Sequence, residues 1–198
     1  MTTSTSQDPQ PHVFRGEIID DAILLGIMPQ LGITQAIEYA PWADAAAREF
    51  SINTSLRLAA WLGQLAHESG QLKYWRELAD GRAYEHRRDL GNLEPGDGTR
   101  FVGRGPIQIT GRSNYTALAN ATGIDCVNKP DLLEKAEHGF RAAGWFWKTH
   151  LLNDFADRWA LASITKIING GLNHYDRRVQ YSNRALEVLQ SRYGTKPV

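Results

Sequence analysis

The feature that most constrains the fold is an apolar run with helical spacing between residues 56 and 67. Apolar and small side chains recur there every three or four positions, as on one face of a helix. They are Leu56, Ala59, Ala60, Leu62, Gly63 and Ala66. Asn53 is a suitable N-cap, and Gly70 stands where a glycine commonly ends a helix. The pattern therefore predicts an apolar helix between these two residues.

The rest of the chain also has mainly helical periodicity. We expect further helices over residues 18–28, 34–39, 42–50, 115–122, 132–149, 159–168 and 177–192. Pro41 is expected to end the first of the two short helices around it. Residues 71–114 differ, because they are rich in glycine, turn signals and charge, and such a long irregular segment often carries function. We predict a mainly α fold with a loop-rich middle.

Length and composition indicate one domain, because 198 residues is an ordinary domain size. Residues 1–13 are expected to form a flexible N-terminal tail that is not a secretory signal, and residues 14–198 the single domain. The formal net charge is zero, so no overall field attracts nucleic acid. No apolar run is long enough for membrane insertion. Cys126 is the single cysteine, so no internal disulfide forms and synthesis in a reducing compartment is expected.

Glu68 is the first candidate for chemistry. It stands in the motif from Ala66 to Gly70, in the last turn of the predicted helix. The negative end of the helix dipole and the apolar neighbours both disfavour an ionised carboxylate there, and this suits a general acid. The alternative is an ordinary surface glutamate near a helix end. A zinc-protease motif is excluded because residue 71 is Gln rather than His.

A second carboxylate is needed if Glu68 cleaves a glycosidic bond with inversion, and the two carboxyl groups should then lie roughly 6.5–9.5 Å apart. Glu77 is the first candidate and Glu85 the second. In an unbroken helix Glu77 would lie about 13.5 Å further along the axis and on the wrong face, so the break at Gly70 is required. The alternative for each is a salt bridge with a neighbouring arginine.

The segment from Gly103 to Thr110 has the sequence Gly-Arg-Gly-Pro-Ile-Gln-Ile-Thr. One interpretation is a Gly-Pro turn that leads into a short strand. The other is that this turn delivers Gln108, Thr110 and Asn114 into a cleft, where they hold a sugar and orient a water. Tyr74 in the loop region offers a stacking surface for a sugar ring. The six histidines are scattered without ligand spacing, so no metal and no cofactor are expected.

Three motifs in this order resemble those of glycoside hydrolase family 19, the plant-chitinase-like family, in its bacteriophage endolysin branch. The first is the acid motif from His67 to Gly70. The second is the central signature from Gly103 to Thr110, continued by Asn114 and Tyr115. The third runs from Ile168 to Gly171. The resemblance covers residues 50–185 and implies a lysozyme-like, two-lobed helical fold with a small β segment bordering a central cleft.

The resemblance also implies an inverting hydrolysis of β-1,4-linked amino sugars. Glu68 matches the general acid, Glu77 the second carboxylate, and Thr110 the residue that helps to hold the water. Glu85 stays open as the second carboxylate, because the stretch from Tyr84 to Asn92 resembles the phage branch. The predicted substrate-binding residues are His67, Tyr74, Glu85, Gln108, Asn114, Asn169 and Arg178.

For the substrate, we expect the glycan strands of bacterial peptidoglycan. The lack of an export signal and of a cysteine-rich binding module favours an endolysin made in the host cytoplasm. A separate holin-type protein would then release it to the periplasm and cell wall, where it acts as a monomer and causes lysis. The alternatives are a chitinase and a non-catalytic sugar-binding protein. The sequence does not distinguish which of the two alternating glycan bonds is cut.

Overall fold

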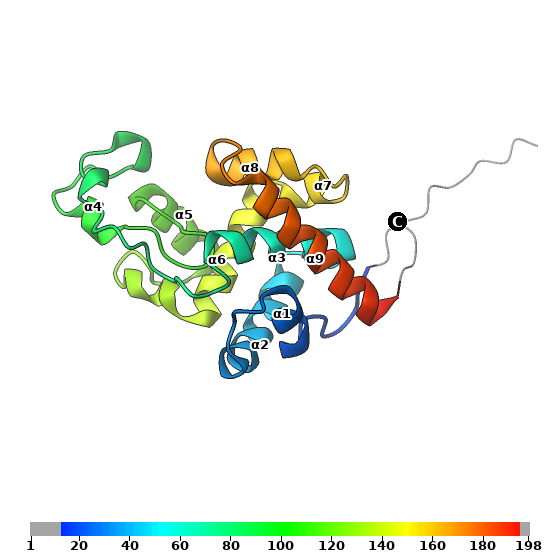
Figure 1. The fold of residues 1–198 in the computed structure, drawn as a ribbon. Helices are drawn as coiled ribbons and strands as arrows, with labels where there is room; N and C mark the ends of the chain where they lie inside the picture. The colour runs from blue at the N-terminus through cyan, green and yellow to red at the C-terminus, as the bar shows by residue number, and fades with distance from the viewer. Residues whose placement is uncertain (1–12, 195–198) are drawn as a thin grey trace, which may run out of the picture.

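The computed structural model describes residues 13–194, in which helices are the dominant element (Figure 1). The α-helices are α1 (Asp21–Ile27), α2 (Ile33–Glu49), α3 (Ser55–Glu68), α4 (Asp97–Arg100), α5 (Arg112–Thr122), α6 (Ala136–Thr149), α7 (Leu152–Ala156), α8 (Leu161–Asn169) and α9 (Tyr175–Tyr193). Short 3-10 helices span Arg82–Tyr84, Arg88–Leu90 and Pro130–Glu134. The predicted mainly α fold is confirmed. The predicted tail lies outside the described residues except for Val13.

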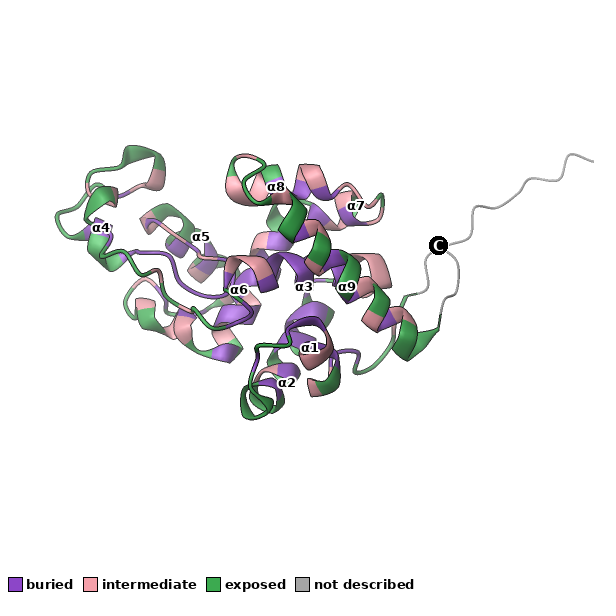
Figure 2. Ribbon diagram, in the orientation of Figure 1, coloured by how far each residue is buried: buried purple, intermediate pink, exposed green. Residues whose placement is uncertain are grey.

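Helix α3 is the central element of the core. Every residue from Leu58 to Ala66 is buried, and α3 packs most extensively against α9. Figure 2 shows this buried middle of α3 beneath its neighbours. The predicted helix is confirmed, but the predicted cap is wrong. Thr54 is the N-cap, and its Oγ1 accepts a hydrogen bond from the amide of Arg57 at 3.3 Å.

Helix α2 runs without interruption through Pro41, so the expectation that this proline ends a helix is wrong. Pro41 is exposed, and so is Ile37, whose carbonyl loses its helical partner. The opposite face buries Ala36, Ala40, Ala43 and Ala47, and α2 packs against α6 along it. The burial of this face outweighs the single hydrogen bond that proline removes.

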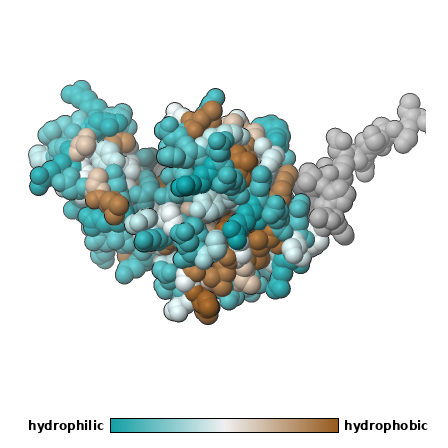
Figure 3. All heavy atoms as spheres, in the orientation of Figure 1, coloured by the Kyte–Doolittle hydropathy of each residue, from teal (hydrophilic) through white to brown (hydrophobic). Residues whose placement is uncertain are grey.

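The loop-rich segment and helices α4 and α5 form a lobe beside the helical body (Figure 1). In the space-filling view the surface is hollowed between this lobe and the body (Figure 3). In place of a sheet, the described chain has only isolated bridges here, between Arg76 and Arg104 and between Arg104 and Ile109. Arg104 is 3% exposed and donates hydrogen bonds to Glu134 at 2.8 Å and to the Tyr115 hydroxyl at 3.1 Å. A buried guanidinium thus holds the segment where the sequence suggested a short strand.

The two ends of the described chain meet on the far side of the body. The rings of Phe14 and Tyr193 lie 4.9 Å apart. The Tyr193 hydroxyl donates to the carbonyl of Ile18 at 2.7 Å, and Arg192 pairs with Asp20 at 3.0 Å. These contacts fasten the end of α9 to the segment that leads into α1.

Candidate active site

Glu68 is the last residue of α3, as the sequence predicted. The chain then turns sharply, because Gly70, Gln71 and Leu72 all have left-handed backbone angles, with φ between 58° and 63°. The Ser69 hydroxyl secures this turn by donating to the carbonyl of Leu65 at 2.6 Å and accepting from the amide of Leu72 at 2.7 Å. The predicted break at Gly70 is confirmed, and it frees the following residues to leave the axis of α3.

Arg178 of α9 binds Glu68 directly. Its Nη1 lies 2.5 Å from Glu68 Oε1 and donates to Gln64 Oε1 at 2.7 Å. The Arg178 side chain is 2% exposed and that of Glu68 is 19% exposed. The surroundings of Glu68 are therefore not simply apolar, as the sequence suggested, because the buried guanidinium of Arg178 pairs with its carboxyl group. The ion pair involves Glu68 Oε1 and leaves Oε2 outside it.

His67 lies beside this pair. Burial, together with the positive charges of Arg178, His174 and Arg177, lowers the pKa of His67 to about 4. Its ring centroid is 5.7 Å from that of His174. His67 is therefore a neutral imidazole at neutral pH, and it adds no charge next to Glu68.

Glu77 is held by the backbone of the Gly103 segment. Its amide donates to the carbonyl of Gly103 at 2.9 Å, and the Gly103 amide donates to Glu77 Oε2 at 3.2 Å. The Tyr84 hydroxyl donates to Glu77 Oε1 at 2.7 Å. This hydrogen bond, with burial and the charge of Glu77, raises the pKa of Tyr84 to about 12. Tyr84 thus keeps its proton and remains a donor to Glu77 across the neutral range.

Three of the predicted side chains converge around Gly103. A Cβ placed on Gly103 would lie 2.8 Å from Gln108 Oε1, 3.2 Å from Glu77 Oε2 and 3.2 Å from Thr110 Oγ1. Gln108 has a left-handed backbone, with φ of 58°, and Thr110 Oγ1 donates to the Gln108 carbonyl at 2.9 Å. A carboxylate, an amide and a hydroxyl thus approach one another closely around Gly103, where a side-chain carbon would be crowded. Such a group of acceptors and donors can position a water molecule.

Glu85 is engaged elsewhere. Its Oε1 accepts from the amide of Gly96 at 2.5 Å and its Oε2 from the amide of Gly98 at 2.7 Å. These two hydrogen bonds lower the pKa of Glu85. Both oxygens thus tie the loop after Tyr84 to the start of α4. This arrangement favours Glu77 over Glu85 as the second carboxylate.

The remaining predicted residues are more dispersed. Asn114 is exposed on α5 and donates to the Thr110 carbonyl at 2.8 Å. Asn169 ends α8, and its buried Nδ2 has no hydrogen-bond partner among the described residues. The structure therefore groups Glu68 with Arg178, and Glu77 with Gln108 and Thr110. The Asn169 side-chain amide is joined to neither group by a hydrogen bond from Nδ2 within the described chain.

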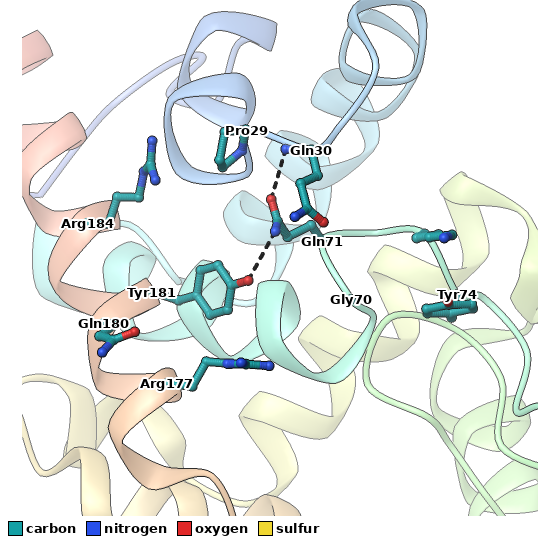
Figure 4. Close-up of a pocket in the computed structure, with 10 residues that line it drawn as sticks. Pro29, Gln30, Gly70, Gln71, Tyr74, Arg177, Gln180, Tyr181 and Arg184 are labelled. Atoms are coloured by element: carbon teal, nitrogen blue, oxygen red, sulfur yellow. Dashed lines mark hydrogen bonds between the residues drawn. The ribbon is translucent and has the colours of Figure 1, made fainter.

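A pocket of about 550 Å³ opens beside the end of α3 (Figure 4). We call it the basic pocket and define it by Gln71, Lys73, Tyr74, Arg177, Tyr181 and Arg184. Tyr74, predicted from the sequence, is 41% exposed on one side of it. The other five were missed, because only the packing of α9 against α3 brings the 71–74 turn beside residues 177–184. In residues 13–194 no cluster of three or more His, Cys, Asp or Glu side chains is placed to hold a metal ion.

Comparison with known proteins relates the chain to one family. Residues 43–158 match the Glyco_hydro_19 family, described as chitinase class I. A glycosyl hydrolase family 19 domain-containing protein of Haemophilus influenzae is 37% identical over 121 residues, which are 60% of this chain and 58% of that protein. Chitinase 8 of Oryza sativa is 32% identical over 168 residues, or 70% and 62% of the two chains. The chain thus spans about three fifths of the length of these curated relatives.

Solved structures show the same fold. A bacterial family 19 chitinase superposes with a TM-score of 0.71 at 23% identity, covering 91% of this chain and 97% of its own. The family 19, class IV chitinase from Zea mays gives a TM-score of 0.70 at 21% identity, covering 87% and 93%. The matched family segment contains Glu68, Glu77, Glu85, Gln108, Thr110 and Asn114, whereas Asn169 and Arg178 lie beyond it.

Proposed function

Because this chain belongs to glycoside hydrolase family 19, we propose that it hydrolyses β-1,4 bonds between amino sugars by an inverting, two-carboxylate mechanism. One observation carries this proposal: Glu77, Gln108 and Thr110 converge at Gly103, while Glu68 is presented at the end of a different element, α3. Two carboxylates from different elements, one of them beside an amide and a hydroxyl that can orient a water, are what direct displacement by water requires.

In this mechanism Glu68 is the general acid. It donates the proton on Oε2 to the glycosidic oxygen as the bond to the leaving sugar breaks. The Arg178 ion pair at Oε1 then stabilises the carboxylate that the proton leaves behind. Neutral His67 adds no repulsion to that pair. General acid catalysis of this kind typically contributes about 10²–10⁴-fold to the rate.

Glu77 is the general base. Its carboxylate takes a proton from the attacking water, and Thr110 orients that water with Gln108. The Tyr84 hydroxyl and the Gly103 amide hold the carboxylate in place through both of its oxygens. The water attacks the anomeric carbon from the face opposite the leaving group, so the product configuration is inverted and no covalent glycosyl–enzyme intermediate forms.

For the substrate, we favour the glycan strands of bacterial peptidoglycan, and the protein would then be a phage endolysin. The resemblance of the stretch from Tyr84 to Asn92 to the phage branch supports this choice. In the structure Asn92 is fully buried and bridges that stretch to α5, donating to the Tyr84 carbonyl at 2.9 Å and accepting from the Arg112 amide at 2.9 Å. Chitin is the second candidate, since the named relatives include chitinases.

The endolysin proposal includes delivery and site of action. The protein would be made in the host cytoplasm and released to the periplasm and cell wall by a separate membrane-permeabilising protein. Within residues 13–194, no helix combines the length and the apolar character needed to cross a membrane. Glycan strands are then its partner, and it acts on them as a monomer.

The mechanism is tested by replacing Glu68. Glu68→Gln keeps the size but removes the proton, and Glu68→Asp keeps the charge that pairs with Arg178 but withdraws the carboxyl group by one methylene. We expect both variants to lose about 10²–10⁴-fold in the rate of cell-wall clearing, while Glu187→Gln, an exposed glutamate of α9, keeps the wild-type rate. Wild-type clearing by Glu68→Gln with an intact unfolding transition would refute the assignment of Glu68.

Substrate and stereochemistry are read from the products. After borohydride reduction, mass spectrometry of digested peptidoglycan identifies a reduced N-acetylmuramic acid end if the protein is a muramidase and a reduced glucosamine end if it is a glucosaminidase. Proton NMR of a freshly cleaved oligosaccharide should show the α-anomer first. An initial β-anomer would mean retention and would exclude the water-activating roles of Glu77 and Thr110.

A further inference from the structure

The basic pocket is unusual in its charge. Three of its side chains are cationic, namely Lys73, Arg177 and Arg184, and no acidic residue lines it. The chain as a whole has a formal net charge of zero, so the pocket is a local concentration of positive charge. Concave sites lined by one sign of charge concentrate the field and attract ions of the opposite sign.

The three cations are not neutralised by the protein. All three side chains are exposed, and in the described part of the chain none of them takes part in an ion pair. Arg184 donates from Nε to the carbonyl of Gly26 at 2.7 Å, which leaves its terminal nitrogens free. Lys73 Nζ lies 5.2 Å from the centre of the Tyr74 ring. These head groups are available to an anionic ligand.

The wall of the pocket is preorganised by Gln71, which is 8% exposed. Its Oε1 accepts from the amide of Gln30 at 3.0 Å, and its Nε2 donates to the Tyr181 hydroxyl at 3.1 Å (Figure 4). One buried amide thereby joins the α1–α2 turn, the turn after α3 and helix α9. The pocket is a fixed part of the fold rather than a gap between independent surfaces.

The pocket adjoins the acid end of the proposed site. Its lining includes Gly70 and Gln71, which lie two and three residues after Glu68, the last residue of α3. On the other side Arg177 lines it, and the next residue, Arg178, is the one that pairs with Glu68. The charge of Arg177 also contributes to the lowered pKa of His67. A polymer bound at Glu68 would therefore lie beside the Arg177 side of the pocket, within reach of charged substituents on the strand.

On these grounds, and resting on the proposed hydrolysis of amino-sugar polymers, we propose that the basic pocket binds carboxylates attached to the glycan strand. Peptidoglycan carries such groups, on the lactyl ether of N-acetylmuramic acid or on the peptide stem attached to it, whereas chitin is uncharged. Guanidinium groups form paired hydrogen bonds with carboxylates. The pocket thus makes the protein select acidic strands over neutral ones.

The test compares one glycan backbone in two charge states. Soluble peptidoglycan strands are used as prepared and after their carboxylates are converted to methylamides with a carbodiimide. We expect the wild-type protein to cleave the acidic strands faster, and the ratio of the two kcat/KM values to fall as ionic strength rises. In Arg177→Gln and Arg184→Gln this ratio should fall about 1.5- to 5-fold for each cation removed, as for exposed ion pairs. Lys148→Gln, an exposed lysine of α6 outside the pocket, should keep the wild-type ratio.

Two further arms complete the design. Strands stripped of their stem peptides by an amidase carry only the lactyl carboxylates that the amide hydrolysis frees, so a preserved preference shows that the lactyl carboxylate suffices as ligand and a lost one assigns the ligand to the peptide. Calorimetric binding of acidic and amidated strands to Glu68→Gln measures the same preference without bond cleavage. If the wild-type protein and the pocket variants give equal ratios in both assays, the inference is overturned while the proposed hydrolysis stands. If binding shows the preference but the wild-type protein cleaves no strand, the hydrolysis fails and the pocket assignment stands.

Discussion

At the scale of single residues, Glu77 and Glu85 differ in what their carboxylates contact. Glu77 shares the space at Gly103 with Gln108 and Thr110, whereas both oxygens of Glu85 accept backbone hydrogen bonds from the loop that begins α4. The same residue type therefore serves two purposes within one segment. One carboxylate lies beside an amide and a hydroxyl, and the other fixes the shape of the loop.

This difference predicts opposite phenotypes for two matched substitutions. Glu77→Gln should lose about 10²–10⁴-fold in kcat, as for the loss of a general base, and keep a melting temperature near that of the wild type. Glu85→Gln should retain most of its activity but melt at a lower temperature. Since hydrogen bonds lower the pKa of Glu85, its contribution to stability is present at neutral pH and is lost as the pH falls. The drop in melting temperature should therefore shrink in acid.

One outcome would reverse the assignment of Glu77 as the second carboxylate. If Glu85→Gln is inactive with an unchanged melting curve while Glu77→Gln still clears cell walls, Glu85 is the second carboxylate. Activity should be normalised to the folded fraction at the assay temperature, because a destabilised Glu85→Gln would otherwise mimic a catalytic loss.

The sequence indicates which residues form the candidate site, but it does not indicate which side chains surround them. Motifs within a few positions of one another indicated Glu68, Gln108 and Thr110, since their spacing is visible along the chain. The ion pair between Glu68 and Arg178 was not predictable from local pattern, because it joins positions far apart in sequence through the packing of α3 against α9. Glu68 therefore has a cationic neighbour, where the sequence of α3 alone predicts apolar surroundings.

At the scale of elements, α3 and α9 approach each other closely at Gly63. A Cβ on this residue would lie 2.3 Å from Ser182 Oγ and 2.6 Å from Ser182 Cα. Because the second of these atoms belongs to the backbone of α9, the clash cannot be relieved by rotating a side chain. The two helices that meet here carry Glu68 and Arg178, so their separation controls the ion pair.

We therefore expect Gly63→Ala to be destabilising, although alanine is the better helix former by about 1 kcal/mol. Overpacking of a core typically costs about 1–3 kcal/mol, and here the rate of hydrolysis should fall as well because the ion pair is pulled apart. Gly26→Ala in α1 is the matched control, since its Cβ would meet only the Val188 side chain, at 3.1 Å. Urea unfolding should show a lower free energy of unfolding for Gly63→Ala than for Gly26→Ala, and the initial rate of hydrolysis should be lower as well. Equal stability and equal rates in the two variants would contradict this account of the interface.

Helix positions were largely predictable from the sequence, and the errors have physical causes. The break after Glu68 follows from Gly70, which adopts a left-handed conformation that glycine accommodates easily. Helix α2 continues past Pro41 because the face opposite the proline is buried, and only tertiary packing reveals that. Helix α7 was missed because it is short and follows Leu151, a non-glycine residue with a left-handed backbone, for which the sequence has no turn signal.

At the scale of the whole molecule, the lowered pKa of His67 links global stability to pH. The pKa falls from the ordinary histidine value of 6.5 to about 4 in the folded protein, so between these pH values the unfolded chain binds more protons than the folded one. The free energy of unfolding then rises with pH through this window. The contribution is complete above about pH 6.5 and is lost as the pH falls to about 4.

The expected size is modest because the ring is only partly buried. A shift of this extent corresponds to at most about 3 kcal/mol, and solvent screening reduces it to about 1–2 kcal/mol. Thermal unfolding of the wild type should show this slope between pH 6.5 and 4, and His67→Gln should flatten it, while His86→Gln, an exposed histidine of the loop-rich lobe, should not. An NMR titration that places the His67 midpoint near 6.5 would contradict the prediction.

The contacts between Phe14 and Tyr193 and between Arg192 and Asp20 have a topological consequence. They bring the two ends of the described chain together. A short linker could therefore join these ends, and the helices could follow one another in a different order while keeping the same contacts. A short linker from residue 13 to residue 194, with a new opening at the exposed turn between Glu94 and Pro95, would give a circular permutant in which α9 precedes α1. Such a chain keeps α3 and α9 as internal elements, and its refolding would report whether the ion pair between them depends on the order in which the two helices occur along the chain.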